Sequence, residues 1–92
     1  FWEPYLLFQA DKYIVDSIDE HRLFEDMGYF PDGLPEIHCE TGEMLAGLKE
    51  GRTDADELII CSNIGISTND VSMGHLILER AFEMGLGRKL PL

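Results

Sequence analysis

The chain has 92 residues, enough for one small domain, and 45% of them are hydrophobic, so we expect it to fold around a core. Eighteen acidic residues against seven basic ones give a formal net charge of −11. A charge of this sign repels nucleic acid and anionic membranes, so we expect neither as a partner. The apolar segment 1–8 is interrupted by Glu3 and Pro4, so we expect neither a membrane span nor a signal peptide there.

The first part of the chain predicts a helix, a strand and a second helix. Residues 1–9 are rich in aromatic residues and leucine, and the proline among them suits a first helical turn. Tyr13–Val15 is a short β-forming run without polar alternation, typical of a parallel sheet covered on both faces. A helix is expected at about residues 18–27, capped by Asp16 or Ser17. Its apolar side would comprise Ile18, Leu23, Phe24 and Met27.

The middle of the chain predicts mostly connecting segments. Residues 29–35 form a loop with a Pro-Asp-Gly turn signal, and Thr41 is a candidate cap for a short helix over residues 43–48. An acidic linker follows at residues 53–57. Its acids alternate as in a calcium loop, but the glycine and the distal glutamate of such a loop are missing, so we expect no metal site. These acids are Asp54, Asp56 and Glu57.

The last third predicts a strand, a turn and a long helix. The strand is Leu58–Cys61, the turn follows over residues 62–70 and contains Gly65, and the helix runs over about residues 70–84. In α/β proteins, a strand followed by such a turn and then by a helix brings backbone amides close to a ligand. The expected caps are Thr68, Asn69 and Asp70, and the expected core stripe includes Met73 and Met84. Gly74 inside this helix suggests close packing against another backbone.

Only two clear strands are present, and a two-stranded parallel sheet cannot satisfy its edges. We therefore expect further strands from a missing amino-terminal part of the polypeptide or from a second copy of the chain. The chain begins with Phe1 rather than Met, so we expect a processed chain or a fragment.

Few side chains suggest chemistry from their sequence context. Asp16 follows the first strand, where open α/β sheets place ligand-facing residues, although a plain helix cap is the favoured interpretation. Cys39 and Cys61 are expected to be buried free thiols in a reducing cytoplasm. His21 and His75 are expected at the surface or at its boundary. We find no nucleophile–base arrangement, and therefore no catalytic residue.

Four ordered motifs resemble the ornithine cyclodeaminase/μ-crystallin family. Residues 10–17 (ADKYIVDS) resemble the late strand of its nucleotide domain. Gly42–Gly47 with Gly51-Arg52 resembles its "GE-I-x-G…GR" segment, and residues 58–70 (LIICSNIGISTND) resemble its closing motif. The helix that ends in Gly85-Leu86-Gly87 also fits, so the resemblance covers nearly the whole chain.

This resemblance implies an α/β fold: the carboxyl-terminal portion of a Rossmann-type NAD(P)-binding domain (residues 1–54), followed by the returning strand and helix of a substrate and dimerisation domain (residues 55–92). Asn63, Ile64 and Gly65 would approach the nicotinamide end of the cofactor, and Asp70 would open the helix behind it. Asn63 departs from the serine that many members carry.

The resemblance also implies the activity. Members transfer hydride between NAD or NADP and the α-carbon of an amino or imino acid, and ornithine cyclodeaminase returns the hydride while ammonia leaves and proline forms. The phosphate loop and the acid–base groups would lie before Phe1, so we expect this chain to be an inactive fragment of a cytoplasmic, homodimeric enzyme. A non-catalytic acidic dimerisation or interaction module from the same family is the alternative.

Overall fold

The computed structural model describes residues 3–91, which form helices and a small parallel sheet. The elements, in chain order, are α1 (Pro4–Leu7), β1 (Lys12–Val15), α2 (Ile18–Asp26), β2 (Ile37–Glu40), α3 (Thr41–Leu45), β3 (Ile59–Ser62) and α4 (Ser67–Glu83). The expected segment at the amino terminus includes Phe1 and Trp2, which lie outside the described residues.

The sheet has three strands in the order β2-β1-β3, all parallel, with β1 in the centre. Ile14 of β1 pairs with Cys39 of β2 on one side and with Cys61 of β3 on the other. The expectation of only two strands was wrong, because Ile37–Glu40 forms β2. This segment has only two apolar residues, and its position at the side of the sheet, where just one neighbour is described, tolerates that composition.

The core lies on β1, where Tyr13, Ile14 and Val15 are each 1% exposed or less. Leu7 of α1 joins Tyr13 and Val15 in the buried cluster. Partly buried apolar side chains pack against this cluster from the neighbouring elements, namely Ile18, Phe30, Leu34, Ile37 and Ile60. The uninterrupted apolar run predicted for this strand is therefore confirmed as a strand with both faces buried.

Helix α2 begins close to its predicted position, and Ser17 is its cap. The Ser17 hydroxyl oxygen accepts a hydrogen bond from the Glu20 amide at 3.3 Å. The predicted apolar side was wrong in part, because Leu23 is 55% exposed and Met27 is 60% exposed. The fully buried residue of α2 is instead His21, which the sequence analysis placed at the surface or its boundary. A histidine can be buried at this position because both of its ring nitrogens have hydrogen-bond partners.

Helix α3 begins at Thr41 rather than being capped by it. Glu40 is the cap, and its side chain and that of Glu43 form a reciprocal capping box with the backbone. The Thr41 hydroxyl donates to the Val15 carbonyl at 3.2 Å, which ties α3 to the end of β1.

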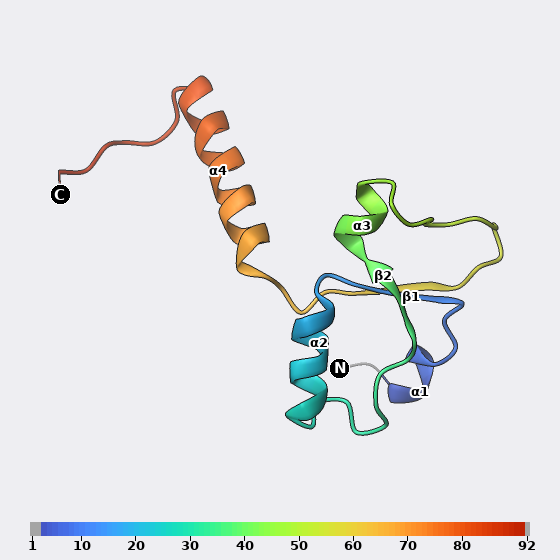
Figure 1. Cartoon of the computed structure of the whole chain (residues 1–92). Helices are drawn as coiled ribbons and strands as arrows, with labels where there is room; N and C mark the ends of the chain where they lie inside the picture. Colours follow the sequence, from blue (N-terminus) through green and yellow to red (C-terminus); the bar gives the residue numbers. More distant parts are fainter. Residues whose placement is uncertain (1–2, 92) are drawn as a thin grey trace.

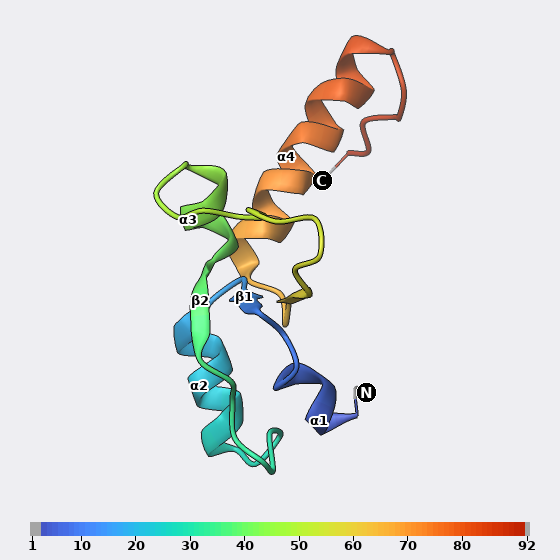
Figure 2. The ribbon, with the colours of Figure 1, turned by 90° about the vertical axis from the view of Figure 1, so that its right-hand side faces the viewer.

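Helix α4 extends away from the sheet in both views (Figures 1 and 2). It begins at Ser67, so the expected caps lie inside it, and Ile66 precedes it without a side-chain cap. Met73 is 58% exposed and Met84 is 69% exposed, so the prediction that they belong to the core was wrong for this chain. A β-carbon at Gly74 would meet no described atom within 4 Å, and the predicted close packing is likewise not seen among residues 3–91. None of the described helices combines the length and the apolar character needed to cross a membrane.

The linker before β3 is held against β1 by a charged pair. The Lys12 ammonium lies 2.8 Å from a Glu57 carboxylate oxygen and donates to the Gly51 carbonyl at 2.7 Å. Glu57 also accepts bonds from the amide and the hydroxyl of Thr53. The acidic linker therefore makes hydrogen bonds and an ion pair within the fold, and these contacts place β3 beside β1.

Replacing Ile14 by alanine should destabilise the fold, because the side chain is removed from the buried centre of the sheet. We expect the free energy of unfolding to fall by about 2–5 kcal/mol, measured by urea unfolding of the complete protein. Lys49→Ala, at an exposed position, should change it by less than about 0.5 kcal/mol. Equal losses in the two variants would contradict the placement of Ile14 in the core.

The stability of the fold should depend on pH through Glu57. Hydrogen bonds from Lys12 and Thr53 lower the pKa of Glu57 from 4.5 to about 2. The ionised carboxylate therefore contributes stability above pH 4.5, and this contribution is lost as the pH falls from 4.5 towards 2. Glu57→Gln should lower stability at neutral pH and flatten its decline in acid, measured by urea unfolding at a series of pH values. Glu50→Gln, at an exposed position, should show the same dependence of stability on pH as the wild type. If Glu57→Gln also showed the wild-type dependence, the stabilising role of the Glu57 carboxylate would be refuted.

Candidate functional site

The carboxyl ends of β1 and β3 meet at one edge of the sheet because the two strands are parallel. Asp16 follows β1, and its amide donates to the carbonyl of Ser62, the last residue of β3, at 3.3 Å. Asn63, Ile64 and Gly65 come next and lead into α4, along the yellow-to-orange segment of Figure 1. The predicted site residues therefore lie where open α/β sheets bind ligands.

Asp16 has a different role from either of its two predicted ones. One carboxylate oxygen accepts from the Ser17 amide at 3.0 Å, and the other accepts from the Gly65 amide at 2.6 Å. Its side chain is only 4% exposed. It is thus neither a plain cap of α2 nor a free ligand-facing carboxylate, because it joins the ends of β1 and β3 across 49 residues of sequence.

The backbone conformation of this turn requires glycine. Gly65 has a φ of +104°, in the region that side chains with a β-carbon rarely adopt. A β-carbon there would meet no described atom within 4 Å, so the constraint comes from backbone strain rather than from crowding. No described residue fills the space beside the Gly65 α-carbon.

His21 and Ser62 form a buried polar pair beside the turn. His21 Nδ1 lies 2.9 Å from the Ser17 carbonyl oxygen, which can only accept, so Nδ1 carries a hydrogen. In the neutral ring Nε2 then accepts a hydrogen bond from the Ser62 hydroxyl at 3.0 Å. No local sequence signal marks this pair, because Ser62 and His21 are 41 residues apart.

This pair does not form a catalytic triad with Asp16. The Asp16 carboxylate lies 3.7 Å from His21 Nδ1, too far for a hydrogen bond, and Nδ1 is already bonded to a carbonyl. His21 is also fully buried, so a substrate would not reach its ring.

The rings around His21 close off the inner side of the turn. Tyr13 lies edge-on to His21, with ring centroids 6.3 Å apart, and Phe30 stacks on His21 at 6.0 Å. Burial raises the pKa of the Tyr13 hydroxyl. His21, which lies behind the turn, is therefore packed against two aromatic side chains.

The predicted site residues differ in exposure. Asn63 and Gly65 are exposed and Ile64 is half-buried. The Asn63 side-chain oxygen accepts a weak bond from the Cys61 thiol at 3.8 Å, and no residue within 3–91 bonds to its amide nitrogen. Their role towards a cofactor stays a prediction.

The two cysteines were expected to be buried, and this is correct only for Cys39. Cys61 of β3 is exposed and Cys39 of β2 is buried, although both strands lie at a side of the described sheet. Both thiols are free. β1 separates the two strands, so the α-carbons lie roughly 9–10 Å apart, beyond the reach of a disulfide.

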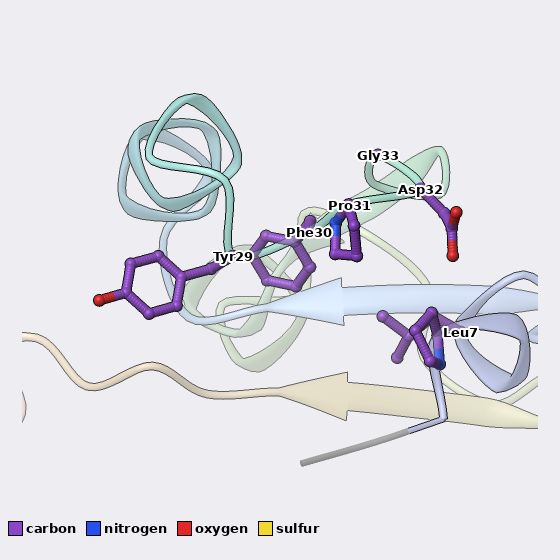
Figure 3. Close-up of a pocket in the computed structure, with 7 residues that line it drawn as sticks. Leu7, Tyr29, Phe30, Pro31, Asp32 and Gly33 are labelled. Atoms are coloured by element: carbon purple, nitrogen blue, oxygen red, sulfur yellow. The ribbon is translucent and has the colours of Figure 1, made fainter.

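A small apolar cavity lies elsewhere, between α1 and the loop after α2. Figure 3 shows Leu7 of α1 facing this loop, which contributes residues 29–33 to the lining. The cavity measures about 80 Å³, far less than the several hundred Å³ typical of pockets for whole organic ligands. None of its lining residues comes from the turn after β3, so the two features are separate.

The solved structure of CmnK has a similar fold, with a TM-score of 0.77 over 97% of this chain and 28% of that protein. The identity is 22%, so this likeness shows the fold alone. It confirms the predicted α/β class and the Rossmann-type portion. The division into domains at residues 54 and 55 stays a prediction; β3, which follows that point, pairs with β1 in the same sheet.

Two curated relatives are similar over most of the chain. Alanine dehydrogenase of Archaeoglobus fulgidus is 33% identical over 91% of the chain, and Delta(1)-pyrroline-2-carboxylate reductase of Bacillus cereus is 35% identical over 89% of it. The chain spans 27% of the length of each of these relatives. Residues 9–85 match the profile of the ornithine cyclodeaminase/mu-crystallin family. The chain therefore belongs to the ornithine cyclodeaminase/mu-crystallin family.

Proposed function

We propose that this chain forms the nicotinamide side of the cofactor site in an NAD- or NADP-dependent enzyme acting on a small amino or imino acid. The supporting observation is the turn 63–65, with Asn63 and Gly65 exposed, at the carboxyl edge of a parallel sheet, in a family whose relatives are named as dehydrogenases and a reductase. The reaction is hydride transfer: the α-carbon of the amino acid gives a hydride to the cofactor and its nitrogen loses a proton, which leaves an imine.

The groups in the turn fit a nicotinamide. Asn63 offers an exposed amide that can both donate and accept, as a carboxamide requires. Gly65 leaves open space beside the backbone, and half-buried Ile64 supplies an apolar contact. When bound, the cofactor supplies the hydride chemistry; the residues of this chain orient the nicotinamide and keep water from one side of it.

The remaining parts of the site are proposed to lie outside these 92 residues. The chain spans only 27% of the length of the two relatives above, and the phosphate-binding and acid–base groups are expected in the rest. We propose that the isolated chain does not catalyse the reaction. Two free cysteines too far apart to pair favour a cytoplasmic location.

Helix α4 is proposed to pack against the remainder of the protein or against a second copy in a homodimer. Apolar side chains along it are largely exposed, including Leu76 at 52%, Ile77 at 61% and Phe82 at 63%. Apolar stretches of this kind mark interaction surfaces. The same exposed helix is what favours the alternative function, a non-catalytic acidic dimerisation or interaction module.

Binding and turnover measurements on the complete protein distinguish these two functions directly. Binding of NADH and NADPH should be followed by the fluorescence of the reduced nicotinamide, and turnover by its absorbance with alanine, ornithine and pyrroline-2-carboxylate. A net change in cofactor redox state would identify a dehydrogenase or reductase, whereas ammonia release from ornithine without that change would identify a cyclodeaminase. Absence of cofactor binding together with stable dimers would support the interaction module instead.

Asn63→Ala should weaken the function by removing one polar contact to the nicotinamide. A net hydrogen bond contributes about 0.5–1.5 kcal/mol, so we expect kcat/KM for the cofactor to fall roughly 2- to 13-fold. The measurement is steady-state kinetics of the complete protein with varied cofactor. Asn69→Ala, at an exposed position inside α4, is the matched control and should leave kcat/KM unchanged. The same kcat/KM in both variants would remove Asn63 from the site.

A further inference from the structure

We propose that Asp16 is a positioning residue: its carboxylate fixes the turn 63–65 in the conformation that orients the nicotinamide for hydride transfer. This inference rests on the proposed function. Asp16 does not itself touch the cofactor in this account, because its side chain is only 4% exposed and both of its oxygens are bonded to backbone amides.

The bond from the Gly65 amide to Asp16 is short and charge-assisted. Its length is 2.6 Å, and hydrogen bonds to a carboxylate are shorter and stronger than neutral ones. The second oxygen of Asp16 accepts from Ser17, the cap of α2, at 3.0 Å. The carboxylate therefore lies at the amino end of a helix, where negative charge is favoured.

The turn has little else to hold it. Within the described range 3–91, the only other side-chain hydrogen bond at residues 63–65 is the weak contact between Asn63 and Cys61. The next fixed point is Ser62, which is held by His21. Gly65 has wide backbone freedom because it lacks a β-carbon, so its single strong bond to Asp16 selects the observed conformation.

The chain offers a matched control at the opposite end of the same two strands. Asp11 precedes β1, and its carboxylate accepts from the amide of Leu58, just before β3, at 2.8 Å. The bond type and the pair of strands are the same, but Asp11 lies at the amino edge of the sheet, away from the turn. Comparing Asp16→Asn with Asp11→Asn separates positioning of the turn from general anchoring of β3.

The experiment uses the complete protein with reduced and oxidised cofactor. An asparagine at position 16 keeps the shape but replaces one accepting oxygen by an NH₂ group that faces an amide N–H. We expect Asp16→Asn to lower kcat about 10- to 100-fold. The Kd of the cofactor should change by less than about 3-fold, because most of the binding contacts of a dinucleotide are made to its phosphates and ribose. Asp11→Asn should leave both constants close to those of the wild type.

Hydrogen exchange supplies a readout that does not depend on activity. Amides of residues 63–66 should exchange faster in Asp16→Asn than in the wild type and in Asp11→Asn. Asp16→Glu, which keeps the charge but not the reach to both amides, replaces Asp16→Asn if that variant does not fold. Equal kcat and equal exchange in the variants at positions 16 and 11 would overturn the inference. A wild type without nicotinamide binding would overturn the proposed function instead, and the exchange comparison would still decide whether Asp16 holds the turn.

Discussion

The parallel pairing of β1 with a neighbour on each side is the constraint on which the rest of this structure depends. β1 contributes three side chains that are each 1% exposed or less, and both β2 and β3 are placed by their hydrogen bonds to it. Charged side chains just outside this buried stretch hold the neighbouring segments. Lys12 binds Glu57 before β3, and Asp16 binds Gly65 after it. Side chains at the two ends of β1 thereby hold the chain before and after β3, and the proposed site lies in the part after β3.

A consequence is that buried, hydrogen-bonded residues lie behind the proposed site, while Asn63 and Gly65 are exposed on its outer side. His21, buried between Tyr13 and Phe30, holds Ser62 at the end of β3. One residue later the chain is exposed at Asn63. A site of this kind can orient a flat ring on a fixed backbone, and it leaves the remaining contacts to other parts of the protein.

The sequence predicted those parts of the fold that local pattern determines. β1, α2 and β3 were found from a buried run, a cap and a strand–turn–helix order. β2 was missed because a strand at the side of the sheet needs few apolar residues, and its hydrogen bonds come from β1 rather than from its own composition. Helix α4 was located, but its apolar stripe was wrongly placed in a core, since periodicity indicates which face is apolar and not what covers it.

The position of the turn 63–65 in the fold was predictable from the sequence, but the contacts that hold it were not. The turn at Asn63, Ile64 and Gly65 follows from the strand–turn–helix order, whereas the bonds from Asp16 and His21 join residues more than 40 positions apart. Such contacts depend on which strands are neighbours, and a single sequence does not contain that information. The same limit explains why His21 was assigned to the surface: its two hydrogen-bond partners, which allow it to be buried, include Ser62 on a distant strand.

The most direct test of the central claim is a crystal structure of the complete protein with NADH or NADPH bound. We expect the nicotinamide to lie against the turn 63–65, with its carboxamide within about 3.5 Å of Asn63 or of a backbone group of the turn. The Asp16–Gly65 hydrogen bond should be retained in that complex. A nicotinamide bound elsewhere, with the turn facing solvent or packed against another part of the protein, would contradict the account.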